Sequence, residues 1–244
     1  MKSKINLLFI FLIVSSLFSC TSMKINLGLK LIGAYDEVII LEKLKNQEKE
    51  IIFFPMVHIG TENFYNDVKM KIDSLEKIGF ITYYEKVDSE INDTLNQRKL
   101  KKITGFPIPK RGRGYMSILD SVFKGKLKKK LISQPNYSVL GVDSLKGTNV
   151  DVNLKQLIAE FERRYGKINL EECDFKTSIH SKTVCKDETI TDKQKDEVIL
   201  GYRNDYITSK ILNGNINKLI LIYGKEHFIG IRKNLQKDGF LINK

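Results

Sequence analysis

Several features that would place this chain in a specialised class are missing or scarce. No apolar run is long enough for a comfortable membrane span, which takes about 20 residues. No internal repeat recurs at a fixed period, which excludes a solenoid. Aromatic residues are sparse in the most basic stretch, residues 98–130, and this argues against binding of single-stranded nucleic acid. Only three histidines and three cysteines occur among 244 residues, so each of them is a candidate for a specific structural or chemical role.

The N-terminus has the pattern of a secretion signal. Residues 1–4 carry two lysines, an apolar run over residues 5–14 follows, and residues 17–20 read Leu-Phe-Ser-Cys. A basic start before a short apolar run is typical of a signal peptide. The last four residues have the form of a lipobox, in which the thiol of Cys20 carries diacylglycerol and becomes the mature N-terminus. We therefore predict a signal peptide over residues 1–19 and a lipoprotein anchored in a bacterial cell envelope, on its periplasmic or surface face.

The rest of the chain is long enough for one domain with a substantial core. We predict a tether over residues 20–35 and a single folded domain over residues 36–244. The formal net charge is +12, of which Lys2 and Lys4 belong to the predicted signal. On an envelope lipoprotein, such an excess matches anionic lipid or polysaccharide better than nucleic acid. We expect the membrane as a partner through the lipid, and no nucleic acid; the oligomeric state is left open.

Two cysteines are left once Cys20 carries lipid. Cys173 and Cys185 flank a short polar stretch, in a compartment where disulfides persist. We predict a disulfide between them, which would stabilise the fold by about 2–4 kcal/mol if unstrained. His180 lies between the two, so a zinc site is the alternative, although a fourth ligand at the usual spacing is missing.

The apolar pattern predicts alternating strands and helices. Strands are expected over residues 36–44, 50–57, 80–87, 137–142 and 218–223. Helices are expected over residues 61–79, 115–123, 152–165, 192–212 and 224–239. Strand–helix–strand units imply parallel strands joined by right-handed crossovers. We therefore expect an α/β fold with a central, mostly parallel sheet, flanking helices and a site at the carboxyl ends of the strands.

Two of the three histidines occupy matching places. His58 follows the strand predicted over residues 50–57, and His227 follows the strand predicted over residues 218–223. The carboxyl ends of parallel strands form the crevice where ligands bind in open sheets. The two imidazoles could face one another there. The alternative is that they are unrelated structural histidines at strand ends.

Glu85 lies at the corresponding place on the strand that follows the His58 unit. Two histidines and a carboxylate with open positions are a common hydrolytic metal set, in which the metal lowers the pKa of bound water to about 7. The sequence therefore predicts that His58, Glu85 and His227 hold a divalent metal ion. Alone, a carboxylate at a strand end is more often a solvated charge or a helix cap.

Arg203 lies on the apolar stripe of the helix predicted over residues 192–212. Burying an unpaired guanidinium costs several kcal/mol, so Arg203 must be paired or point into a cleft. One interpretation is that Arg203 positions a substrate, with Asn204 beside it. The other is a salt bridge inside the core wall, with Asp205 as its structural partner.

Together these motifs resemble the TraB/Tiki family, within a wider group of erythromycin-esterase-like and ChaN-like haem-binding proteins. The resemblance covers residues 50–240 and rests on Met56-Val57-His58-Ile59-Gly60, the Glu85 strand end, the Arg203-Asn204 pair and the Gly-x-x-His that ends at His227. It implies an α/β fold with a cleft formed by these side chains and, for the Tiki branch, divalent-metal-dependent proteolysis with manganese or cobalt.

The chain departs from the family pattern at three places. Pro55 stands where the family often has the leading glycine of the first Gly-x-x-His, Asp143 is an acid without a matching family role, and the basic stretch over residues 98–130 is additional. These departures bear on the substrate and the metal more than on the fold.

Two hypotheses of different classes follow. In the first, the chain is a metal-dependent hydrolase that cleaves a peptide, or else an ester or another small molecule. Its manganese, cobalt or zinc ion is held by His58, Glu85 and His227, while Arg203 binds the substrate carbonyl or carboxylate and Asn204 orients it. In the second, it is a ChaN-like surface lipoprotein that binds haem through His58, His227, Tyr83 or Tyr84 without hydrolysis. A protein that keeps the cleft but has lost catalysis is a third possibility.

Overall fold

The computed structural model of the chain describes residues 23–88, 93–110, 114–117, 127–182, 185 and 190–243. The predicted signal peptide over residues 1–19 and its Cys20 lie outside the described residues, as does most of the helix predicted over residues 115–123. Within the described ranges, no helix is both long and apolar enough to cross a membrane.

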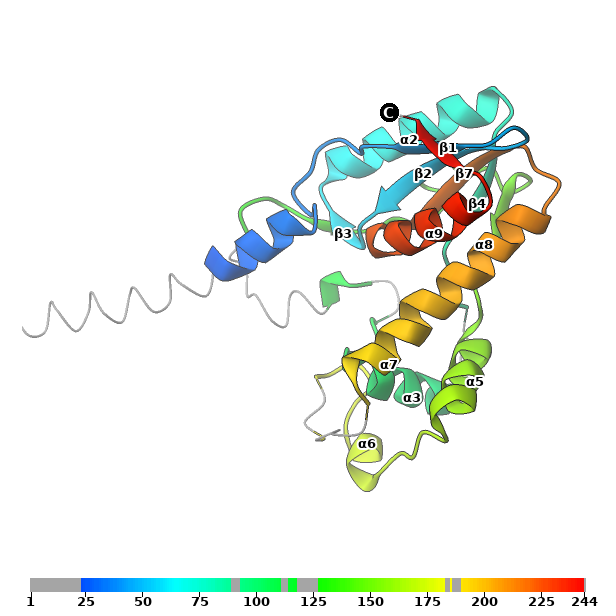
Figure 1. Ribbon diagram of the computed structural model, residues 1–244. Coiled ribbons are helices and arrows are strands. Elements are labelled where there is room, and N and C mark those ends of the chain that lie inside the picture. The colour runs from blue at the N-terminus through cyan, green and yellow to red at the C-terminus, as the bar shows by residue number, and fades with distance from the viewer. Residues whose placement is uncertain are drawn as a thin grey trace, which may run out of the picture.

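A mostly parallel sheet of six strands forms the centre of the molecule (Figure 1). The strands lie in the order β6 (Gly147–Asn149), β4 (Ile81–Tyr84), β7 (Lys218–Gly224), β2 (Glu50–Met56), β1 (Glu42–Lys45) and β8 (Leu241–Asn243). All pairs from β6 to β2 are parallel, and β1 runs antiparallel to both β2 and β8. The predicted α/β class with a central, mostly parallel sheet and flanking helices is confirmed.

Helices cover both faces of this sheet (Figure 1). On one face lies α2 (Glu62–Lys77), which begins at Thr61, whose hydroxyl accepts a hydrogen bond from the Phe64 N–H. On the other lie α8 (Arg203–Asn213) and α9 (Lys225–Lys237). Successive residues of a strand point to opposite faces, so β2 and β7 must be apolar on both sides, and each reads as an unbroken apolar run.

A group of helices packs away from the sheet (Figure 1). It consists of α3 (Thr94–Thr104), α5 (Leu154–Tyr165), α6 (Glu172–Lys176) and α7 (Asp192–Asp196). Ile103, Leu157 and Phe161 are buried in its core together with Val198 of the π-helical segment η1 (Glu197–Tyr202). The continuous run of α7, η1 and α8 connects this helical layer to the sheet.

A disulfide joins Cys173 to Cys185, whose Cα atoms lie 5.8 Å apart. It closes a loop beside α6. The guanidinium of Arg98 on α3 donates to the carbonyls of Asp174 and Thr177 in that loop, so the loop is held against the helical layer by hydrogen bonds as well as by the disulfide.

Four segments differ from the prediction. Residues 137–141 form turns, so the strand predicted over residues 137–142 is wrong. Leu140 and Val142 are apolar because they close one end of the core under α2, not because they pair in a sheet. β6 and β8 were not expected, since both are short. Residues 23–31, in the predicted tether, are helical, and Leu29 packs on Leu131 near the two-stranded sheet of β3 (Ile59–Gly60) and β5 (Ile132–Ser133).

Candidate active site

Four neighbouring parallel strands end at one edge of the sheet, and a polar candidate follows each. In the order of the sheet, Asp151 follows β6, Glu85 follows β4, His227 follows β7 and His58 follows β2. The pairing registers keep these ends level: Tyr84 pairs with both Asn149 and Ile222, and Met56 pairs with Gly224. Parallel pairing thus brings residues from four distant parts of the chain to one place.

Arg203 is the centre of this place. Its Nε and Nη2 donate to the two oxygens of Asp151, at 3.0 and 2.6 Å, and Nη2 also donates to Glu85 Oε1 at 2.6 Å. Nη1 donates to the carbonyl of Ile199, one turn earlier. The side chain is 7% exposed. The salt-bridge interpretation therefore applies, but with Asp151 and Glu85 as partners in place of Asp205, which instead accepts a hydrogen bond from Asn234.

Glu85 is held at both carboxylate oxygens. Oε1 binds Arg203, and Oε2 accepts the backbone N–H of Gly224 at 2.6 Å. Burial alone would raise the pKa of Glu85, but the charge of Arg203 and the hydrogen bond from the Gly224 N–H lower that pKa to about 2. Glu85 is therefore ionised at any pH at which the protein would work, and it carries a fixed negative charge.

His227 is buried in the first turn of α9, with 3% of its surface exposed. Its Nδ1 lies 2.7 Å from Oδ1 of Asn204. Because that oxygen only accepts, Nδ1 must donate, which leaves Nε2 as an acceptor 3.7 Å from Glu85 Oε1. Burial lowers the pKa of His227 to about 4, despite the opposing charge of Glu85. His227 is thus a neutral imidazole in a fixed orientation.

Gly230 makes the contact between α8 and α9 close enough for the Asn204–His227 hydrogen bond. A Cβ at position 230 would lie 2.1 Å from Nδ2 of Asn204 and 3.0 Å from its Cγ. Any larger residue would therefore push Asn204 away from the imidazole. Gly224, which donates its N–H to Glu85, would place a Cβ 3.2 Å from that carboxylate.

His58 differs from the buried members because its side chain is exposed. Its ring stacks on Tyr115, with the ring centroids 4.4 Å apart and the planes 11° from parallel. His58 lies close enough to act electrostatically on both Glu85 and His227. It is therefore the solvent-facing member of the group, above a buried set of charges.

Sequence reasoning missed three contributors to the site. Asp151 follows a strand of only three residues, β6, whose polar sequence gives little signal. The Tyr137 hydroxyl donates to the Glu85 carbonyl, and the Tyr84 and Tyr137 rings lie 4.2 Å apart. The hydroxyl of Tyr223, in the interior near these charges, has no hydrogen-bond partner among the described residues.

Asp151 and Glu85 share one guanidinium, and their pKa values move in opposite directions. Burial raises the pKa of Asp151, although hydrogen bonds from Arg203 and from the Val152 N–H oppose the shift. A single positive charge cannot fully offset two buried carboxylates. Arg203 therefore compensates the charge of Glu85 more fully than that of Asp151.

The other predicted residues lie elsewhere. His180 is exposed in the disulfide loop, where Nδ1 lies 2.7 Å from the carbonyl of Ile108. Asp143 caps a turn beside Glu76. Tyr83, one of the haem candidates, packs on the core under α8 and α9.

The predicted metal ligands do not form a ligand set in this geometry. Among the residues that the structure describes, no group of three or more His, Cys, Asp or Glu side chains is arranged to hold an ion. Both oxygens of Glu85 already accept strong hydrogen bonds, and a dication on Oε1 would lie beside the Arg203 guanidinium, which would repel it. The donors do not fit a divalent ion as they stand, and metal binding stays a prediction.

Comparisons with models of protein families, with curated proteins and with solved structures found no match to this chain. The resemblance to the TraB/Tiki family accordingly stays a prediction from its motifs.

Proposed function

We propose that the chain is a hydrolase that cleaves acyl bonds, in peptides or esters, at the carboxyl edge of its sheet. The observation that carries the proposal is the buried cluster of Arg203, Glu85 and Asp151 beneath the exposed imidazole of His58. Buried ion clusters add little to the stability of a fold, whereas strongly shifted pKa values concentrate at functional sites. The TraB/Tiki-like motifs support the same class of reaction.

His58 is the general base in this proposal. As the exposed imidazole, it can take a proton from a water molecule that attacks the substrate carbonyl, a role that histidine fills most often. The fixed charge of Glu85 would stabilise the imidazolium that forms. Tyr115, stacked on the ring, limits its rotation. His58 would then return the proton to the leaving group.

The buried residues act on His58 indirectly. Arg203 keeps Glu85 ionised and fixes its orientation, and Asn204 fixes the neutral His227 beside it. Arg203 is thus a positioning residue, because its donors are already used by Asp151, Glu85 and Ile199. An electrostatic arrangement fixed before the reaction is usually the largest single contribution to enzymatic rate.

The metal-dependent form and the haem-binding alternative stay predictions. In the metal form, Glu85 would have to release its hydrogen bond from Arg203 and bind the ion instead. The haem form depends on His58 as the exposed ligand. Cys20 lipidation and an envelope location also stay predictions, and they favour substrates found outside the cytoplasm.

The first test is a rate comparison on two substrate panels, 4-nitrophenyl esters and fluorogenic peptides. Glu85→Gln keeps the shape of the side chain and removes its charge, so we expect kcat/KM to fall by about 100-fold or more. Glu172→Gln is the matched control, because Glu172 pairs with Lys176 on the surface and is 80% exposed. Its rate should be unchanged.

Each assay is repeated after chelation and after addition of manganese, cobalt or zinc. A hydrolytic rate that is unchanged after chelation supports the mechanism based on His58. A rate that is lost on chelation and restored only by adding an ion supports the metal-dependent form. Circular dichroism checks that Glu85→Gln is folded. Absence of hydrolysis on both panels, with and without metal, would overturn the proposed function.

A further inference from the structure

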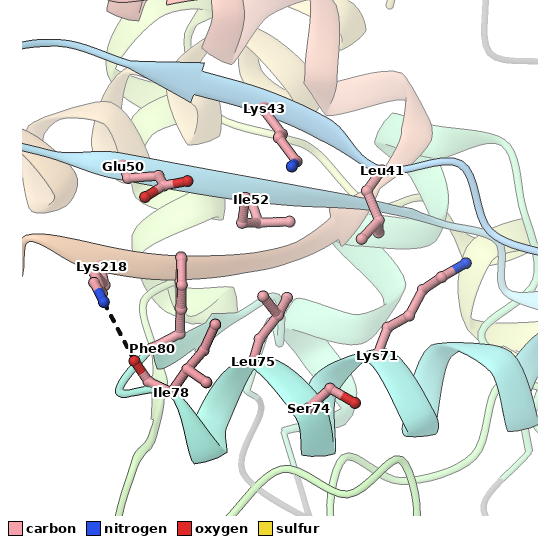
Figure 2. Close-up of a pocket in the computed structure, with 10 residues that line it drawn as sticks. All are labelled: Leu41, Lys43, Glu50, Ile52, Lys71, Ser74, Leu75, Ile78, Phe80 and Lys218. Carbon is pink, nitrogen blue, oxygen red and sulfur yellow. Dashed lines mark hydrogen bonds between the residues drawn. The ribbon is translucent and has the colours of Figure 1, made fainter. Parts of the chain in front are cut away.

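A second concave site lies at the other end of the sheet. A pocket of about 390 Å³ lies between α2 and the sheet (Figure 2). Glu50 and Lys218, which line it, are the first residues of β2 and β7. His58 and His227 follow the last residues of those same strands. The pocket is therefore separated from the candidate active site by the length of the strands.

The pocket is open because α2 does not cover the whole face. On β1, Leu44 is buried in the core on the opposite face, so the alternation of a strand points Lys43 to the side of α2. Figure 2 shows Leu41 and Lys43 projecting toward α2, with Leu75 and Ile78 on the facing side. The result is a groove where the layer between the sheet and α2 meets solvent.

Apolar side chains form most of the wall of this groove. They are Leu41, Ile52, Leu75, Ile78 and Phe80. Ile78 is 61% exposed, so apolar surface continues from the pocket to its rim. The volume lies within the range of about 300–1,000 Å³ that is usual for small-molecule sites.

Three lysines and one carboxylate supply the charge, so the lining is net positive. Lys71 is neutralised by Asp67 at 2.6 Å, and Lys218 donates to the Ile78 carbonyl at 3.3 Å. The backbone of Lys43 pairs with β2 and β8, but its side-chain ammonium has no hydrogen-bond or ion-pair partner among the described residues. Figure 2 shows its ammonium directed over Ile52. An unpaired cation beside an apolar wall is complementary to a ligand with an apolar body and one negative charge.

We propose that this pocket binds an anionic amphiphile with a single alkyl chain, of the fatty-acid class. The chain would lie along Leu75, Ile78 and Phe80, and the carboxylate would pair with Lys43. Apolar burial would supply most of the affinity, and Lys43 would select the sign of the head group. This site is independent of the proposed hydrolase activity.

The test uses laurate as the probe, below its micelle concentration, with binding followed by isothermal titration calorimetry on the purified protein. Dodecyltrimethylammonium has the same chain with the opposite charge, and acetate has the head group without the chain. We expect saturable one-to-one binding of laurate and at least tenfold weaker binding of both controls. Absence of saturable laurate binding, or equal binding of the cationic amphiphile, would overturn the proposal.

Two variants locate the site. Lys43→Glu should weaken laurate binding by about tenfold or more, which corresponds to about 1.4 kcal/mol. Lys45→Glu is the matched control: Lys45 is exposed, two residues along on the same face of β1, and outside the pocket. Ile78→Asp, at an exposed position, should also weaken binding without unfolding the protein. Equal losses in the Lys43 and Lys45 variants would indicate general surface attraction and would refute the site.

Discussion

His58 and His227 follow two strands, β2 and β7, that lie side by side and run parallel, yet one imidazole is exposed and the other is buried. After β2, the chain passes through His58 and the short β3 before α2 begins at its cap, Thr61. After β7, the chain enters α9 at once, which puts His227 into the first helical turn. A helix that begins directly at the strand end buries its histidine, and an intervening loop leaves the other at the surface.

This difference separates two roles. His227 is neutral, fixed by Asn204 and adjacent to the Arg203 cluster. His58 stacks on Tyr115 and is exposed to solvent. The buried unit should therefore respond to mutation through stability, and the exposed unit through reactivity.

The largest expected effect is the loss of the buried guanidinium. Arg203→Ala leaves Glu85 and Asp151 buried without their partner, so we expect the free energy of unfolding to fall by about 3–5 kcal/mol. Urea denaturation followed by circular dichroism measures this. Arg163→Ala is the control, because Arg163 pairs with Glu160 at the surface and is 68% exposed. Similar losses of unfolding free energy in both variants would show that the buried ion pairs of Arg203 contribute no more to stability than a surface pair does.

A smaller effect should separate the two histidines. His227→Ala leaves Asn204 Oδ1 buried without its donor, and we expect a loss of about 1–3 kcal/mol in the free energy of unfolding. His58→Ala removes an exposed side chain and should change the free energy of unfolding by less than about 0.5 kcal/mol. The same denaturation experiment compares them. A larger loss for His58→Ala would reverse the assignment of roles.

The stability of the fold should also depend on pH. The pKa of His227 is about 4 in the folded protein, against an ordinary value of 6.5. The unfolded chain therefore binds a proton that the folded protein does not, and the stability contributed by the neutral imidazole is complete above pH 6.5 and is lost as pH falls toward 4. Glu85, with a pKa of about 2 against 4.5, adds a loss between pH 4.5 and 2.

The urea midpoint at pH 7.5, 6.0 and 5.0 measures the first part of this loss. We expect the wild-type midpoint to decrease over this range and the decrease to be smaller in His227→Gln. A slope that is unchanged in His227→Gln would mean that another group controls acid sensitivity.

The sequence was sufficient to predict the elements that depend on local pattern. β2 and β7 are long apolar runs, and α2 has a capping threonine and a regular apolar face. The strand–helix–strand order predicts parallel strands in one sheet, and parallel strands place His58, Glu85 and His227 at the same edge. Those parts of the candidate site could be predicted because they depend only on the strands running parallel in one sheet, and not on their order, in which β7 lies between β4 and β2.

The partners of Arg203 could not be predicted in the same way. Asp151 lies 52 residues away and follows β6, whose Gly-Thr-Asn sequence is held in the sheet by backbone pairing with β4. Asp205 is near Arg203 in sequence, but residues two apart on a helix do not face each other, and Asp205 accepts a hydrogen bond from Asn234 of α9. Long-range packing, not local sequence, selects the ion pairs at this site.

The most direct test of the central claim is the hydrolytic rate of His58→Gln on the substrate that the wild-type protein cleaves best. His180→Gln is the matched control, because His180 is also exposed but lies in the disulfide loop. We expect kcat/KM to fall by about 100-fold or more in His58→Gln and to stay unchanged in His180→Gln, with both variants folded. Equal rates in His58→Gln and the wild-type protein would contradict the role of His58 as general base.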